Sequence, residues 1–113
     1  MKYKQSIGGL FYEINIEKKE AIVTGAAQTA KDIIIPMNVE YLNQKIPIKR
    51  IAPGAFKNNS NIQSLVFERS VIDLIPDDAF LSSSLTKIVI SNKIVRIGKN
   101  AFKDCHYLKQ LII

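Results

Sequence analysis

The stretch LTKIVISNKIVRIGKNAFKDCHYL, residues 85–108, decides the fold, because most of the chain from residue 33 onward repeats it. Its residue types predict a short apolar strand, a corner, a second short strand, and a tight turn that closes on Ala101 and Phe102. Self-similarity at a fixed period is the signature of repeat architectures. The stretch therefore predicts one turn of a solenoid, here called a rung, with neighbouring rungs on either side.

Two anchors recur in every rung. The pattern LxxLxL begins at Ile62, Leu85 and Leu108, which are 23 residues apart. The pattern IxxxAF carries Phe56, Phe80 and Phe102, which are 24 and then 22 residues apart. Since the shifts compensate, each rung returns to the same place on its neighbour, and we expect the three rings to stack in the centre of the coil. A β-sandwich with chance Ala-Phe pairs is the alternative, which the threefold coincidence of both anchors disfavours.

The turns between strands have their own residue types. Glycine, proline and aspartate are the residues that tight turns favour, each for a different backbone reason. They occur here as Pro53, Gly54, Pro76, Asp77, Asp78 and Gly98.

The segments IGKNAFKDCHYLKQLII (97–113) and IKRIAPGAFKNNSNIQSLVF (48–67) resemble the BspA-type leucine-rich repeats of bacterial and protist surface proteins. The likeness covers residues 46–113; it departs at 71–75, which hold one extra residue, and at Asn59 and Ser83, the counterparts of Cys105. The resemblance implies a right-handed leucine-rich repeat solenoid, mainly β with short helical or 3-10 turns. It also implies a cell-surface or secreted protein that acts in adhesion or protein binding and not in catalysis.

Length and composition describe a single soluble domain of 113 residues, with 47% hydrophobic and 23% charged residues. No run of 18 apolar residues occurs, so no membrane span is expected. The first residues, MKYKQSIGGLFYEI, have no apolar core before Glu13, and we expect no signal peptide in this chain.

The sequence offers little for catalysis, metals or cofactors, and we expect none of the three. Its one cysteine, Cys105, precludes an internal disulfide, and its place in the repeat points it inward, where a free thiol behaves as a small hydrophobe. The one histidine, His106, is its neighbour in a turn, where adjacent side chains point apart. The acids Glu68, Asp73, Asp77, Asp78 and Asp104 are expected in turns or on a flank, in no catalytic motif.

The net charge of +6 is compatible with a mildly anionic partner. The 16 Lys and Arg residues are scattered, with tight clusters only at 18–19 and 49–50, and no nucleic-acid-binding module is present. We therefore expect a protein partner, not a nucleic acid.

The chain divides into an N-terminal cap, residues 1–31, and the repeat rungs, residues 32–113. Residues 1–9 are predicted to be a loose lead-in, and residues 10–24 a β-hairpin that covers the first rung. Residues 33–35 are the first repeat strand, which Pro36 ends. Residues 37–45 exceed their later counterparts in length and predict an extra strand or hairpin arm beside the cap.

The last residues, 111–113, predict a strand with nothing to cover it. Such a strand exposes an apolar face and unpaired backbone groups. Either the chain was shortened from a longer array or a second copy covers this end, and we expect self-association through it in both cases.

The repeat also predicts which residues face a partner. In a leucine-rich solenoid the leucine positions of LxxLxL point inward and the residues between them face solvent on a parallel sheet. This register puts four aliphatic residues in one outward column: Ile34, Val66, Val89 and Ile112. Polar residues flank it: Ser64, Glu68, Lys87, Ser91 and Gln110. An apolar stripe with a polar rim is typical of an interface core, although β-branched residues also simply stabilise strands.

A second outward row, Arg50, Leu74 and Arg96 beside Lys49, Asp73 and Val95, is interpreted as a solvated, mildly basic flank. The leading functional hypothesis is thus a non-catalytic interaction or adhesion module that binds protein through the sheet face. The alternative is a structural spacer or capping part of a longer repeat array, with no binding role of its own.

Overall fold

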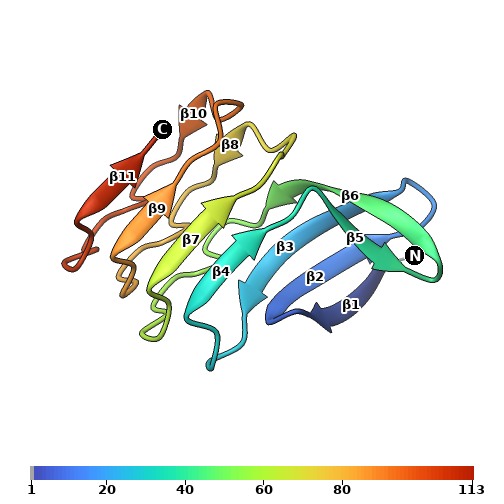
Figure 1. The fold of residues 1–113 in the computed structure, drawn as a ribbon, viewed down its shortest axis with the longest axis horizontal. Helices are drawn as coiled ribbons and strands as arrows, with labels where there is room; N and C mark the ends of the chain where they lie inside the picture. The colour runs from blue at the N-terminus through green and yellow to red at the C-terminus, as the bar shows by residue number, and fades with distance from the viewer. Residues whose placement is uncertain (1) are drawn as a thin grey trace.

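The computed structural model describes residues 2–113, which form eleven β-strands and no helix (Figure 1). This part of the chain accordingly has no helix able to cross a membrane. The strands are β1 (Lys2–Ile7), β2 (Leu10–Asn15), β3 (Glu20–Ala26), β4 (Asp32–Ile35), β5 (Asn38–Tyr41), β6 (Gln44–Ile51), β7 (Ser64–Phe67), β8 (Leu74–Ile75), β9 (Lys87–Val89), β10 (Arg96–Ile97) and β11 (Gln110–Ile112).

Four strands form one parallel sheet in the order β11-β9-β7-β4, and Figure 1 shows them side by side along one face. The leucine positions of the repeat point inward, so that Leu65 and Ile88 are fully buried. The predicted rungs are therefore confirmed: their first strands lie next to one another in one parallel sheet, as the 23-residue spacing indicated.

The second strand of each rung is short but present. Strands β8 and β10 pair in parallel, with Leu74 opposite Arg96 and Ile75 opposite Ile97. Ile75 is buried, whereas Leu74 and Arg96 face outward as predicted.

The phenylalanines of the IxxxAF pattern stack down the centre of the coil. The ring centroids of Phe56 and Phe80 are 5.2 Å apart, and those of Phe80 and Phe102 are 5.3 Å apart, with interplanar angles of 5° and 3°. These offset stacks bury Phe56 and Phe80 almost completely. The stack is what the spacing of the Ala-Phe pairs predicted.

The chain forms hydrogen-bonded turns at the three Ala-Phe pairs. The short helical or 3-10 turns expected from the resemblance do not occur within residues 2–113. A left-handed residue precedes and follows each pair, which stops a helix from propagating. The preceding positions are Gly54, Asp78 and Asn100, and the following ones Asn58, Ser82 and Asp104, with φ between 57° and 68°. Adjacent turns bond to each other: the Phe56 N–H donates to Ala79 O and the Phe80 N–H to Ala101 O, each at 2.8 Å.

The N-terminal region is a five-stranded sheet in the order β1-β2-β3-β6-β5. Its predicted hairpin is present as β2 and β3, joined by the charged turn and paired antiparallel. The prediction of a loose lead-in is wrong for residues 2–7, which form β1 and pair with β2 over its whole length; residue 1 lies outside the described residues. Gly8 and Gly9, both with positive φ, make the two-residue turn that directs β1 back onto β2.

The predicted extra arm is a second hairpin, formed by β5 and β6. Its turn uses Leu42 and Asn43, both with positive φ. Strand β6 then pairs in parallel with β3, Ala21 lying opposite Ile48 and Val23 opposite Ile51. The sheet thus takes in residues beyond 31, and the division of the chain at residues 31 and 32 stays a prediction.

Candidate functional site

The four outward aliphatic residues form one continuous row across the parallel sheet, here called the aliphatic column. Ile34 lies opposite Val66, Val66 opposite Val89, and Val89 opposite Ile112. Ile34 is 55% exposed and Ile112 42%, while Val66 and Val89 are half-buried between their neighbours. With strands about 4.8 Å apart, the column runs for about 15 Å over the face of the molecule.

Polar residues border the column on both sides. One row, in register across the four strands, is Asp32, Ser64, Lys87 and Gln110. The Ser64 hydroxyl donates to a carboxylate oxygen of Asp32 at 2.8 Å, which fixes both side chains. Glu68 and Ser91 follow β7 and β9 on the other side. The sequence interpretation did not include Asp32 in this polar row. Its position directly before the first repeat strand was the available signal.

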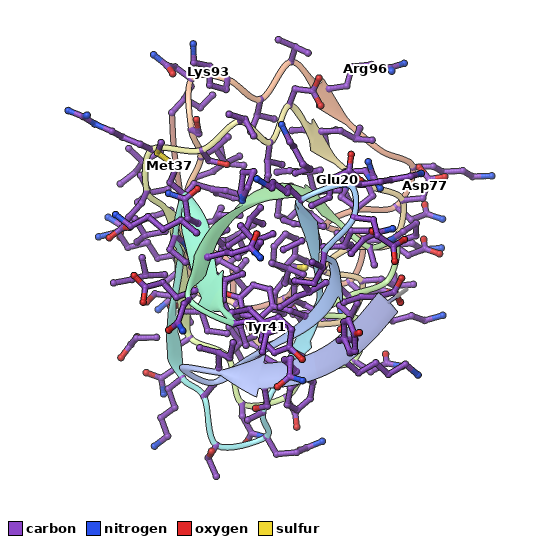
Figure 2. All side chains as sticks on the ribbon, turned by 90° about the vertical axis from the view of Figure 1, so that its right-hand side faces the viewer. Glu20, Met37, Tyr41, Asp77, Lys93 and Arg96 are labelled. Carbon is purple, nitrogen blue, oxygen red and sulfur yellow. The ribbon has the colours of Figure 1, made fainter. Side chains whose placement is uncertain are left out.

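A hollow of about 270 Å³, here called the corner hollow, lies beyond the column, where β4, β7 and β9 end. Its apolar wall includes Met37 and Val71, which are 45% and 51% exposed. Arg69 and Lys93 supply two cationic side chains. Figure 2 shows Met37 and Lys93 on the same corner of the molecule. The hollow was not foreseen, although the extra residue at 71–75 marks the turn that forms its wall.

The basic flank lies on another side of the molecule, and in the view of Figure 2 Glu20, Asp77 and Arg96 all lie on the side away from Met37. The Arg50 guanidinium is 3.7 Å from a Glu20 carboxylate oxygen, and both side chains are substantially exposed at 58% and 29%. Exposed pairs of this kind contribute little to stability. Two hollows adjoin the flank: a small one beside Arg50 and Glu20, and one of about 320 Å³ whose lining includes Val95, Arg96 and Ile113.

The Cys105 thiol points inward and donates to the carbonyl oxygen of Phe80 at 2.9 Å, with the Ser83 hydroxyl 3.6 Å away. It is half-buried and not fully buried as expected, because it lies in the last described rung. His106 is exposed beside it. A nucleophilic thiol needs a base within hydrogen-bond reach, and the thiol's bonds here go to a carbonyl and a hydroxyl.

Three of the acidic residues, Asp77, Asp78 and Asp104, lie in turns. Asp77 accepts the Lys99 N–H at 2.7 Å, and Asp78 and Asp104 occupy left-handed turn positions. Across residues 2–113, no three histidine, cysteine or acidic side chains gather closely enough to hold a metal ion.

The parallel sheet, the second short strands and the central phenylalanine stack together define a leucine-rich repeat solenoid. The chain belongs to the BspA-type leucine-rich repeat family: the family model described as "BspA type Leucine rich repeat region (6 copies)" matches residues 35–113. That match covers β7, β9 and β11, which carry three of the four residues of the aliphatic column, but only the last residue of β4.

Solved structures of bacterial leucine-rich repeat proteins share the fold. The pneumococcal vaccine antigen PcpA is 18% identical with a TM-score of 0.63, over 97% of this chain and 38% of its own. A leucine-rich repeat protein from Bacteroides capillosus ATCC 29799 is 19% identical with a TM-score of 0.55, over 96% and 64%. One from Bacteroides ovatus ATCC 8483 is 15% identical with a TM-score of 0.56, over 98% and 41%. This chain thus spans less than two thirds of each of these proteins. Among curated proteins no match was found.

Proposed function

We propose that this chain is a non-catalytic protein-interaction or adhesion module that binds its partner through the parallel-sheet face. The aliphatic column carries the proposal. Four apolar side chains in register, on a face that the rest of the described chain leaves open, with polar residues on both sides, have the anatomy of a small interface core and rim.

The charge at the corner hollow points to an acidic partner segment. Arg69 and Lys93 stand at the corner hollow, and the chain as a whole carries a net charge of +6. The hollow has room for one aliphatic or aromatic side chain of the partner. A partner strand with an apolar residue flanked by carboxylates would fill the hollow and pair with both cations.

We further propose that the parent protein is displayed on the cell surface or secreted. Membership of a repeat family found in bacterial surface proteins supports this location. Extracellular matrix and host surface proteins are then the partners to test first.

The experiment measures binding of the immobilised chain to a panel of purified extracellular matrix proteins by interferometry. The double variant Val66→Thr, Val89→Thr keeps β-branched side chains of nearly the same shape but hydrates the centre of the column. We expect at least one matrix protein to bind the native chain and to bind the variant at least tenfold more weakly.

Val95→Thr is the matched control, because Val95 is 76% exposed on the second strand row, away from the parallel sheet. It should leave binding unchanged. Equal binding by the native chain and the double variant would rule out the sheet face as the binding surface. A chain that binds none of the panel, while a longer native array does, would support the spacer function instead.

We also propose that the outer edge of β11 is a second contact surface. Leu111 and Ile113 are 44% and 87% exposed, and β11 is hydrogen-bonded to β9 on one side. Homo-association of the 113-residue chain through this edge stays a prediction, and Leu111→Lys should raise the concentration at which dimers appear in sedimentation velocity.

A further inference from the structure

A second hollow, here called the serine groove, lies at the edge of the molecule where β7 and β9 begin. Its volume of about 760 Å³ falls within the range of about 300–1,000 Å³ that is common for small-molecule sites. The serines of residues 82–84 line its middle. Asn61 and Gln63 stand on one side, and His106 and Tyr107 on the other.

The groove exists because one turn is shorter than its neighbours. Phe80 and Leu85 are five positions apart, whereas Phe56 and Ile62, and Phe102 and Leu108, are six positions apart. Both ends of the short turn are fixed, since Phe80 is held in the ring stack and Leu85 is fully buried. The turn is therefore shorter by one residue in its exposed part. Its surface lies lower than the surfaces of the two longer turns beside it.

The short turn also has the smallest polar side chains. The hydroxyls of Ser84 and Thr86 donate to the carbonyl oxygens of Ile62 and Gln63, which orients them and leaves their lone pairs free to accept. Ser82 and Gln63 are exposed, and their side chains have no hydrogen-bond partner within residues 2–113. The groove thus offers hydroxyl and amide groups that can both donate and accept.

One wall adds an aromatic surface. Tyr107 is 63% exposed, an unusual position for so large a ring, and it stands next to His106 at the groove. Asp104 is the one acidic residue of the described lining, which includes no lysine or arginine. A ligand of the groove is therefore expected to be uncharged, rich in hydroxyl groups, and apolar on one face.

We propose that the serine groove binds a neutral oligosaccharide. Sugar hydroxyls both donate and accept, which matches the serine, threonine and amide groups of the lining. The apolar C–H face of a pyranose ring can pack on Tyr107, whose hydroxyl then remains available to a further sugar oxygen. The groove adjoins the polar row of the sheet face at Gln63 and Thr86, but none of its lining residues belongs to the aliphatic column.

The test uses the full ¹⁵N-labelled chain and records amide chemical shifts during addition of neutral hexaoses of glucose, mannose, galactose and N-acetylglucosamine at millimolar concentration. We expect at least one hexaose to shift the amides of residues 60–63, 82–86 and 104–107 in a saturable way. Absence of saturable shifts in these segments with all four sugars would overturn the proposal.

Three variants locate the ligand. Tyr107→Ala should weaken the sugar about tenfold, whereas Tyr107→Phe should retain most of the affinity because the ring face remains. Insertion of one asparagine between Ser83 and Ser84 restores the length of the neighbouring turns and should fill the groove, which abolishes binding. Circular dichroism and thermal unfolding check that the insertion variant still folds.

Phe11→Ala is the matched control, since Phe11 is another exposed ring, in β2 of the N-terminal sheet and outside the lining of the groove. Its affinity should equal that of the native chain. Sugar binding that survives both Tyr107→Ala and the insertion would place the ligand elsewhere and refute the groove. Loss of matrix-protein binding in the insertion variant, with no sugar bound by the native chain, would assign the groove to the protein interface instead.

Discussion

The N-terminal sheet and the repeat rungs are held together in different ways. Strands β1, β2 and β3 have six or seven residues each and pair across tight turns, so that Gln5 lies opposite Tyr12. Strands β7 and β9 have four and three residues, and Val66 pairs with Val89, 23 positions further on. Local turns therefore define the first region, whereas the second depends on distant rungs that support one another.

The two regions also bury their apolar surface in different places. The N-terminal sheet buries alternate residues of long strands, such as Ile14 and Val23. The rungs have strands too short to bury much area alone, so the interior of the turns adds the ring stack. A substitution in the stack should thus disturb several rungs at once, while one in a hairpin should stay local.

The largest expected effect follows from Phe80→Ala. Phe80 is fully buried between two rings, and its removal should lower the free energy of unfolding by about 3–5 kcal/mol. Denaturant unfolding measures the loss, and hydrogen exchange should show lower protection in β7 and β9 than in β2 and β3.

Tyr3→Ala gives the comparison in the other region. Tyr3 and Tyr41 also form a ring pair, with centroids 5.7 Å apart, but both rings are half-exposed. Tyr3→Ala should lower the free energy of unfolding by clearly less than Phe80→Ala does. The loss of hydrogen-exchange protection should be confined to β1, β5 and their neighbours. If Phe80→Ala cost only a few tenths of a kcal/mol, the stack would not be the source of rung stability.

Glycine-to-alanine substitutions test the same comparison, because each adds a single methyl group to one of the two regions. A Cβ on Gly98 would lie 2.5 Å from the backbone nitrogen of Asp77, so Gly98→Ala forces adjacent rungs apart and should cost about 1–3 kcal/mol. Gly8 in the N-terminal turn has open space but a φ of 61°, and Gly8→Ala should cost about 1–2 kcal/mol through backbone strain alone.

Asparagine variants distinguish a steric clash, expected at Gly98, from backbone strain, expected at Gly8. Asparagine tolerates the left-handed region better than alanine does. Gly8→Asn should be more stable than Gly8→Ala, whereas Gly98→Asn should be no better than Gly98→Ala. The same order at both positions would mean that space is not what requires glycine between the rungs. Thermal unfolding of the four variants decides between these outcomes.

The N-terminal sheet should also be the more sensitive region at alkaline pH. Burial raises the pKa of Tyr12 from 10.0 to about 12. Between these values the unfolded chain loses the phenolic proton while the folded chain keeps it, so stability falls as pH rises from about 10 to 12. The loss should not exceed about 3 kcal/mol, because a pKa difference of one corresponds to about 1.4 kcal/mol.

Tyr12→Phe removes this titration, and its unfolding free energy should decline less steeply over that pH range. Because every other group is the same in both proteins, the difference between the two curves is the quantity to measure. Parallel curves would contradict the raised pKa.

The smallest effect on stability is expected for Val66→Thr with Val89→Thr. These side chains face outward on the sheet, so the free energy of unfolding should change by less than about 1 kcal/mol, the sum of two surface substitutions. Chemical denaturation tests this, and a larger loss would mean that the aliphatic column supports the fold as much as it serves a partner.

Sequence reasoning predicted the rungs well because their anchors are apolar, buried and periodic. The stack of Phe56, Phe80 and Phe102 and the register of Val66 with Val89 both follow from spacing. The register of Ile34 with Val66, 32 positions further on, follows from the apolar run at residues 33–35. Strand β1 was missed because Lys4 and Ser6 give it a polar appearance, although the Gly8-Gly9 pair was a hairpin signal.

The hollows were harder to predict. The corner hollow and the serine groove depend on the relative height of adjacent turns, a property of two or three rungs together. The sequence contains the extra residue near Val71 and the missing one between Phe80 and Leu85. Spacing alone does not say whether an added or missing residue changes the surface or is absorbed inside the coil.

The direction of the hydrogen bonds in the parallel sheet has a mechanical consequence. Bonds between β4, β7, β9 and β11 run along the axis of the stack, and the two ends of the chain lie at opposite ends of it (Figure 1). A pulling force between the ends therefore loads the rung interfaces one after another and not in shear. The array should extend stepwise at modest force, each freed rung of 23 residues lengthening the chain by about 75 Å, so that the protein should yield gradually under load instead of resisting as a rigid body.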